Sequence, residues 1–314
     1  MKVAMKNAIE VQLNPTENFF LPLDKLFRQV FNPAIKVSIR NVVECEKPRI
    51  LTAYSLSVDS FNQFDKLVFC AAVSEKNAGN EVFTIRRLWR TMGGGHVLPA
   101  EMREKITESV KRLADSRIKI DMTPINNVHH YTDEREVIFR NSILPCSPAV
   151  LKINGQVDEN GYLFTGKSPL ISVAELKKQI TKKPIGLLAV PRLYNLTTAL
   201  KIKFYLFERI TATLGSLKPH KKHFRGKKGG GFYFKQAQEL NPTILLDALF
   251  NQCELSDADK WQKQDVRKTI TQVMNHFKAA QFIDDWNFEK GSGGITRAVV
   301  FEPSKDSRYP PAEK

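Results

Sequence analysis

Three helices followed by two strands are predicted twice along this 314-residue chain, an order that predicts an α+β fold of two winged-helix (helix-turn-helix variant) domains in tandem. A hydrophobic content of 42% and a length of about two ordinary domains support this division. We expect an N-terminal extension over 1–45, a first winged-helix domain over 46–150, connecting strands over 151–190, a second winged-helix domain over 191–303 and a C-terminal tail over 304–314.

The first half contains three segments with helical spacing of apolar residues. The segment 61–80 ends at an Ala-Gly-Asn turn, a short helix begins near Thr84 and stops at a triple glycine, and a third helix over 99–117 opens with a proline. Apolar and polar residues then alternate in RIKIDMT and again in EVIFRNSILP. These two stretches are predicted to pair as the β-hairpin wing of the first domain.

The second half repeats this order. A helix over 195–214 precedes a basic, glycine-rich loop, and the next helix, in NPTILLDALFNQC, is expected to be capped by Asn241 and to begin at Pro242. The third helix covers 260–280, and two strands joined by a glycine-rich turn follow over 286–301. The plan is again three helices and a hairpin.

The charge of the chain indicates a polyanionic partner. Lys and Arg number 48 against 33 Asp and Glu, a net charge of +15, and no acidic residue occurs from Arg209 to Gln238. Such a protein is attracted to nucleic acid first and to an anionic membrane surface second. No apolar run reaches the roughly 20 residues of a membrane span, and no secretory signal is present, so we expect a cytoplasmic protein without a membrane partner. The four cysteines are scattered, which favours neither a disulfide framework nor a zinc site, and no metal or cofactor is expected.

The third helix of the second half is the candidate for base recognition. Its apolar residues fall on one face, so the polar residues between them fall on the opposite face, and none of the four central ones is acidic. Gln and Asn can bond adenine edges, Lys can bond guanine or phosphate, and Thr can contact the thymine methyl. An ordinary solvated face, the alternative, would normally carry glutamates. The candidate base-reading residues are Gln264, Lys268, Thr271 and Asn275.

A second set of residues is predicted to contact phosphates. The loop between the first two helices of the second half carries cations for affinity and glycines for close approach, although it could also be a solvated loop without this role. The hairpin that follows could equally be a wing or a plain surface turn. The phosphate candidates are Lys218, Lys221, Lys222, Arg225, Lys227, Lys228, Lys263, Arg267, Lys290 and Arg297 in the second half, and Arg86, Arg87 and Arg90 in the first.

The first domain is less suited to base reading. The outer face of its third helix carries Glu101, Glu104 and Glu108, and carboxylates repel phosphate. Dimerisation or docking of a partner is at least as strongly indicated as DNA contact. If it contacts DNA, Lys105 and Arg112 are expected to contribute with the three arginines.

Three motifs suggest catalysis but lack the necessary context. GYLFTGKS, Gly161 to Ser168, matches the phosphate-loop expression, yet bulky residues stand where the backbone must curl and Pro169 follows at once. In VHHYTDE the two histidines are adjacent, whereas a metal-dependent nickase needs a residue between them. His220 and His223 have ligand-like spacing, but the surrounding cations oppose a metal ion. We therefore expect a protein that is not an enzyme.

The segments FDKLVFCAAVSEKNAGNEVFTIRRLWRTMGG, LPCSPAVLKINGQ and LKIKFYLFERI resemble the replication initiator proteins of bacterial plasmids and related mobile elements, which contain two winged-helix domains. The resemblance covers most of the chain. It implies binding to repeated double-stranded sequences in an origin, local melting of the duplex, and recruitment of the host helicase or its loader. It also implies a homodimer formed through the first domain and a second domain that grips the repeat. A winged-helix regulator of transcription or copy number, without initiator activity, is the alternative function.

Overall fold

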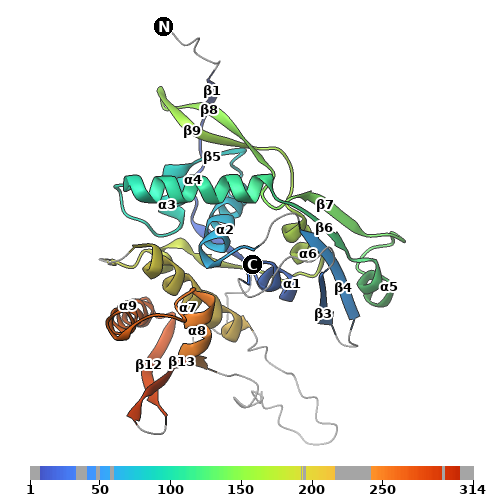
Figure 1. Ribbon diagram of the computed structural model, residues 1–314. Helices are drawn as coiled ribbons and strands as arrows, with labels where there is room; N and C mark the ends of the chain where they lie inside the picture. Colours follow the sequence, from blue (N-terminus) through green and yellow to red (C-terminus); the bar gives the residue numbers. More distant parts are fainter. Residues whose placement is uncertain are drawn as a thin grey trace, which may run out of the picture. The chain divides into compact units, whose positions relative to one another are not determined.

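The computed structural model describes residues 8–32, 41–46, 50–56, 60–191, 193, 196–215, 242–291 and 294–304. The fold is mixed α+β, and the chain divides into two compact units, Met1–Ala189 and Val190–Lys314 (Figure 1). The boundary lies close to the start predicted for the second domain. Because each unit buries its own core, each is described separately.

Helix α2 (Gln63–Asn77) is the centre of the first unit and is buried from Gln63 to Glu75. It begins with a capping box between Asn62 and Asp65, in which each side chain accepts a hydrogen bond from the other residue's backbone N–H. The sequence predicts one apolar face, but β2 (Asn18–Pro22), α3 (Ile85–Thr91) and α4 (Ala100–Asp115) all contact this helix. Its polar residues are therefore enclosed, which requires internal partners for each of them.

A four-stranded sheet next to these helices has the order β1–β8–β9–β5. It consists of β1 (Ile9–Val11), β8 (Cys146–Ile153), β9 (Gln156–Phe164) and β5 (Val82–Thr84). Strands β8 and β9 form a hairpin whose two-residue turn, Asn154–Gly155, has positive φ at both residues. Asn-Gly suits this turn because both residues adopt the left-handed conformation readily.

A second four-stranded sheet has the order β3–β4–β6–β7, and it corrects the wing predicted for the first domain. Strands β6 (Arg117–Asp121) and β7 (Ile138–Ser142) are antiparallel as predicted, but helix α5 (Thr123–His129) separates them. Their sheet contains β3 (Asn41–Glu46) and β4 (Ile50–Leu56) rather than β5. The hairpin that pairs with β5 is β8–β9, because a tight turn brings these long strands directly together (Figure 1).

The predicted N-terminal extension and connecting stretch are both integral parts of the first unit. Strand β2 pairs with β10 (Ile180–Pro184), so residues near the N-terminus bond to residues of the predicted connection 151–190. Next to this pair, α6 (Pro169–Leu176) is followed by Lys177, whose Nζ lies 2.6 Å from Oδ2 of Asp24, with both side chains 1% exposed. Pairing between segments so distant in sequence leaves no local periodic signal, which is why the connection was predicted as separate.

The second unit follows the predicted element order with one change. It contains α7 (Leu196–Gly215), α8 (Leu246–Gln252), α9 (Lys260–Ala279) and the hairpin of β12 (Ile283–Lys290) and β13 (Thr296–Pro303). The second helix begins at Leu246 and not at Pro242, because Thr243–Leu245 forms strand β11, which pairs with β13. The resulting sheet has the order β11–β13–β12. Asn241 and the basic loop lie outside the described residues.

Neither a metal cluster nor a membrane span is found in the described part of the chain. There, no group of three or more His, Cys, Asp or Glu is placed to hold a metal ion, and no helix is long and apolar enough to cross a bilayer. Cys146 and Cys253 are free thiols, and burial raises the pKa of each to about 12. These two thiols are therefore unreactive at neutral pH.

The buried Lys203 of α7 makes the stability of the second unit dependent on pH. Burial lowers the pKa of its ammonium group from 10.5 to about 7, so between these values the unfolded chain binds more protons than the folded one. Folding stability therefore rises with pH across this window, by about 1.4 kcal/mol for each unit of pKa difference. A Lys203→Met variant has no amine to neutralise. We expect its unfolding free energy to exceed that of the wild type most below about pH 7, and the difference to shrink towards about pH 10.

Urea unfolding of both proteins across this pH range measures that difference. Subtracting the two curves removes the contributions of other groups, including Tyr205, whose pKa burial raises to about 12. If the difference in unfolding free energy between variant and wild type stays constant with pH, the Lys203 amine does not have a lowered pKa in the folded protein.

Candidate nucleic-acid interface

Helix α9 is held rigidly in the second unit. A capping box between Asp259 and Gln262 fixes its first turn, and the buried residues Val266, Ile270 and Val273 form its inner face. Phe277 lies among Phe207 of α7 and Phe282, with ring centroids 6.5 and 5.4 Å apart respectively. Burial of these side chains determines which face of α9 remains in solvent.

The four residues predicted to read bases lie on or near the solvent face of α9. Gln264, Lys268 and Asn275 are exposed, while Thr271 is half-buried and its Oγ1 donates a hydrogen bond of 2.9 Å to the Arg267 carbonyl. Among the described residues, the Gln264 side chain has no hydrogen-bond partner. Helical spacing thus places the three exposed side chains on one stripe of the helix surface, and Thr271 lies at the margin of this stripe.

Asn275 is oriented by a neighbouring strand. Nε1 of Trp286 in β12 donates a hydrogen bond of 3.0 Å to Oδ1 of Asn275. Because an indole N–H can only donate, the amide oxygen must face Trp286 and the amide NH₂ group points away from it. The oxygen retains a second lone pair, so the side chain can still both donate and accept towards an adenine edge.

Lys268 has an exposed carboxylate beside it. Its Nζ lies 3.0 Å from Oδ1 of Asp265, one turn earlier on the helix, and both side chains are about two-thirds exposed. Exposed pairs of this kind contribute little to stability and exchange easily for other partners. Lys268 can therefore turn to a phosphate or base. Asp265, the one acidic residue of α9, marks the edge of the stripe that a polyanion approaches least readily.

The hairpin beside α9 carries two of the predicted phosphate ligands. Lys290 and Arg297 are exposed near its tip, where Gly294 has a φ of +74° and the Gly291 N–H donates a bond of 2.8 Å to the Ile295 carbonyl. Ile295 itself is 70% exposed. The hairpin therefore ends in a narrow turn flanked by cations.

The remaining predicted phosphate ligands of the second unit divide into two groups. Lys263 and Arg267 are both exposed on α9, and Arg267 lies beside the stripe. The other six lie outside the described residues: Lys218, Lys221, Lys222, Arg225, Lys227 and Lys228.

A concave basic site in the first unit was not predicted as such. A pocket of about 700 Å³ is lined by α3, the start of α4 and the β8–β9 hairpin. Arg86 and Arg90 were predicted phosphate ligands, and Arg103 of α4 joins them; in the described part of the chain the three guanidinium groups have no ion-pair partner. Asp158 on the hairpin is the acidic residue of the lining. The pocket can accept an anion between a helix and a hairpin.

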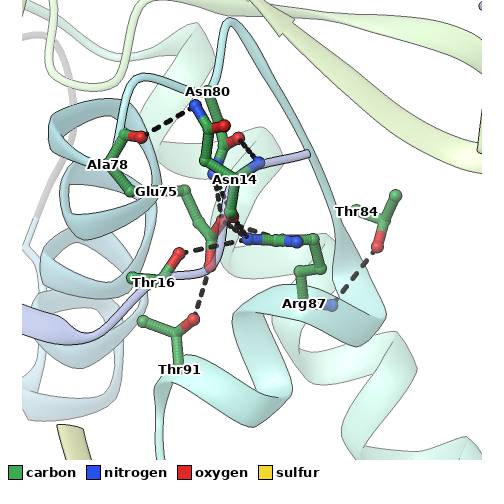
Figure 2. Close-up of polar contacts among 8 residues, drawn as sticks. All are labelled: Asn14, Thr16, Glu75, Ala78, Asn80, Thr84, Arg87 and Thr91. Atoms are coloured by element: carbon green, nitrogen blue, oxygen red, sulfur yellow. Dashed lines mark hydrogen bonds and ion pairs between the residues drawn. The ribbon is translucent and has the colours of Figure 1, made fainter. Parts of the chain in front are cut away.

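Arg87, although adjacent in sequence, is used inside the protein (Figure 2). Its Nε donates a hydrogen bond of 2.8 Å to Oε2 of Glu75, whose side chain is 1% exposed, and its Nη2 bonds to the Asn14 carbonyl and to Thr16 Oγ1. Thr91 donates a bond of 2.6 Å to the other oxygen of Glu75. The guanidinium neutralises a buried carboxylate and ties the N-terminal segment to α2 and α3, so it is committed to the fold.

Other charges of the first unit follow the predicted acidic pattern. Glu101, Glu104 and Glu108 are exposed on α4, and Lys105 lies 2.6 Å from Glu101. Arg112 Nη2 lies 2.5 Å from the buried Oδ1 of Asp65, so this arginine also has a structural partner. The outer face of α4 therefore remains unfavourable for phosphate.

Two of the motifs that suggest catalysis make contacts within the fold. Within Gly161 to Ser168, the first four residues belong to the antiparallel strand β9, and Lys167 forms an ion pair with Glu175 of α6. The His129 ring stacks on Tyr131 with centroids 5.5 Å apart. His220 and His223 lie outside the described residues.

Trp261 is the feature of this surface that periodicity analysis missed. It is 75% exposed in the first turn of α9, three residues before Gln264 and seven before Lys268, and so lies on the same stripe. The signal was present in the sequence: an aromatic residue stands out of phase with the apolar face.

No protein-family model and no curated protein matches the chain. Among solved structures, it is similar to a crystal structure of a selenomethionine derivative of RctB domains 2 and 3 (10% identity, TM-score 0.41, covering 90% of this chain and 97% of that one). It is similar also to a crystal structure of RctB domains 2–3 (11% identity, TM-score 0.45, covering 90% and 98%).

The contrast between Arg87 and Arg86 can be tested by stability. Arg87→Ala leaves the Glu75 carboxylate buried without its cation, which we expect to cost about 3 kcal/mol of unfolding free energy. Arg86→Ala removes an exposed side chain and should change that quantity by less than about 0.5 kcal/mol. Urea unfolding measures both, and equal effects of the two substitutions would contradict the assignment of Arg87 to the core.

Proposed function

We propose that the chain is a sequence-specific double-stranded DNA-binding protein whose second unit is a winged helix with α9 in the major groove. The observation that carries this proposal is the solvent stripe of α9, where Gln264, Lys268 and Asn275 lie in line on a helix fixed by its buried face. A recognition helix contacts base edges from such a face, and its partner hairpin contacts the backbone as a wing. Lys290 and Arg297 are suitably charged for that second role.

The first unit supports a tandem arrangement. Helix α2, strand β5, helices α3 and α4, and the β8–β9 hairpin follow the same order as α7, β11, α8, α9 and the β12–β13 hairpin. We propose that this unit is also a winged helix, in which Arg86, Arg90 and Arg103 contact phosphate between helix and hairpin. The acidic outer face of α4 disfavours base reading by this unit, and we assign homodimer formation to it as a further role.

The biological role that best fits such a chain is that of a replication initiator. It would bind origin repeats of a plasmid or mobile element, promote local melting and recruit the host helicase or its loader, without catalysing a reaction itself. A transcriptional or copy-number regulator with the same fold is the second candidate, since both need the same DNA-binding surface. Directly repeated sites beside an AT-rich segment would favour the initiator, and a single palindrome over a promoter would favour the regulator.

Selection of bound duplexes from a random pool, at near-physiological salt, is the primary test. A defined enriched motif is expected, and its arrangement near the coding region separates the two candidates. Binding without any enrichment would overturn sequence-specific recognition and leave a non-specific polyanion-binding protein.

Base reading by α9 predicts a loss of discrimination. Asn275→Ala or Gln264→Ala should each cost about 1–3 kcal/mol on the preferred site and much less on random DNA, because only the preferred site offers the matching base edge. Asn287→Ala, on the exposed side of β12, is the matched control and should leave the preference unchanged. Fluorescence anisotropy on both duplexes provides the measurement, and equal losses on the two would contradict base reading.

Phosphate contact predicts a change in salt dependence. With about six phosphates neutralised, the logarithm of the binding constant should fall with the logarithm of salt concentration at a slope of roughly −5. Replacing Lys221, Lys222, Lys227 and Lys228 with alanine should reduce this slope by up to about 4, and replacing Arg86 and Arg90 by up to about 2, for every sequence alike. Binding isotherms at several salt concentrations measure the slopes, and an unchanged slope would remove the substituted residues from the interface.

A further inference from the structure

Trp261 is a large apolar side chain left in water on an otherwise polar surface. Its side chain is 75% exposed, and it is the one aromatic residue among the exposed large hydrophobic residues of the described chain. An indole buries a large area when covered, so its exposure on a rigid helix is a cost that a binding partner can reverse. The described residues offer its ring no aromatic contact, and its Nε1 bonds to none of them.

The position of Trp261 indicates which partner covers it. It lies at the N-terminal end of the same stripe as Gln264 and Lys268, in the part of a recognition helix that reaches base edges most directly. Its neighbours on the helix surface, three and four residues further on, are the exposed Gln264 and Asp265, and Lys268 follows after seven residues. A protein-binding hot spot would be surrounded by further apolar residues, whereas this indole adjoins the polar stripe of Gln264 and Lys268.

Duplex DNA fits this site better than unpaired bases do. Proteins that hold single strands present several aromatic side chains along a groove, so that successive bases can stack. Trp261 stands alone on the outer face of a helix of 20 residues. In the major groove, the apolar group that a base pair presents is the C5 methyl of thymine.

Resting on the proposed function, we propose that Trp261 packs against a thymine C5 methyl in the major groove of the preferred site and thereby selects thymine at that position. Gln264 and Asn275 then read hydrogen-bonding edges along the stripe, while Trp261 reads the methyl group beside them. Discrimination arises because cytosine lacks this methyl group and presents a polar amino group to the indole.

The test removes the methyl group from the DNA and the indole from the protein. Each thymine of the enriched site is replaced in turn by deoxyuridine, which keeps the base pairing and deletes only the methyl. Affinities are measured for the wild type, for Trp261→Ala and for Leu245→Ala, an exposed apolar residue outside α9 that serves as the control. Circular dichroism verifies that each variant is folded. Because both side chains are exposed, neither substitution should disturb the core.

At one thymine position, deoxyuridine should weaken wild-type binding about fourfold, the value of one buried methyl group. The same replacement should change binding of Trp261→Ala by less than about twofold, and that variant should bind the unmodified site about 5- to 30-fold more weakly than the wild type. Leu245→Ala should behave as the wild type does.

Three results would overturn the inference while leaving sequence-specific binding intact. These are a Trp261→Ala variant with wild-type affinity, equal deoxyuridine effects in wild type and variant, and a variant that loses single-stranded but not duplex binding. Failure of the proposed function itself has a different signature, because the wild type would then enrich no sequence from the random pool.

Discussion

Burial of the apolar face of α9 against α7 and the hairpin is the constraint on which the candidate interface depends. Phe277, enclosed by Phe207 and Phe282, prevents rotation of the helix about its axis. A rotation by one residue would move the polar stripe about 100° and bury its amides without partners. Hydrophobic packing therefore fixes which residues face solvent, and for Asn275, which bonds to Trp286, the cost of orienting the side chain is met during folding rather than on binding.

In the first unit, buried carboxylates decide which basic residues remain available to a ligand. In the first unit, Glu75 and Asp65 are enclosed around α2, so each requires a cation, and Arg87 and Arg112 supply the charge. Arg86 and Arg90 lie outside these networks and line the pocket with Arg103. Charge counted along the sequence therefore overstates what this unit can offer to phosphate.

Local patterns in the sequence predicted most helices and the hairpin of the second unit, because α2, α4 and α9 each repeat apolar residues over several turns. Contacts distant in sequence were not predictable in this way: β1 and β2 join strands beyond residue 145, and β5 pairs with β9. The stripe on α9 was accessible to periodicity. The bond from Trp286 to Asn275 was not, since register across a sheet and helix decides it.

The proposed initiator would have to hold its site firmly while the bound duplex opens. If a few side chains of one rigid helix read the bases, the remaining contacts are to the DNA backbone and do not depend on sequence. Such backbone contacts tolerate distortion of the base pairs. Arg86, Arg90 and Arg103, which face a concave pocket rather than a flat helix surface, suit a backbone that has been bent towards them. If the proposed roles of the two units hold, one unit that reads bases and one that holds the backbone would accommodate strain on bound DNA, because affinity that carried sequence information in both units would resist the deformation.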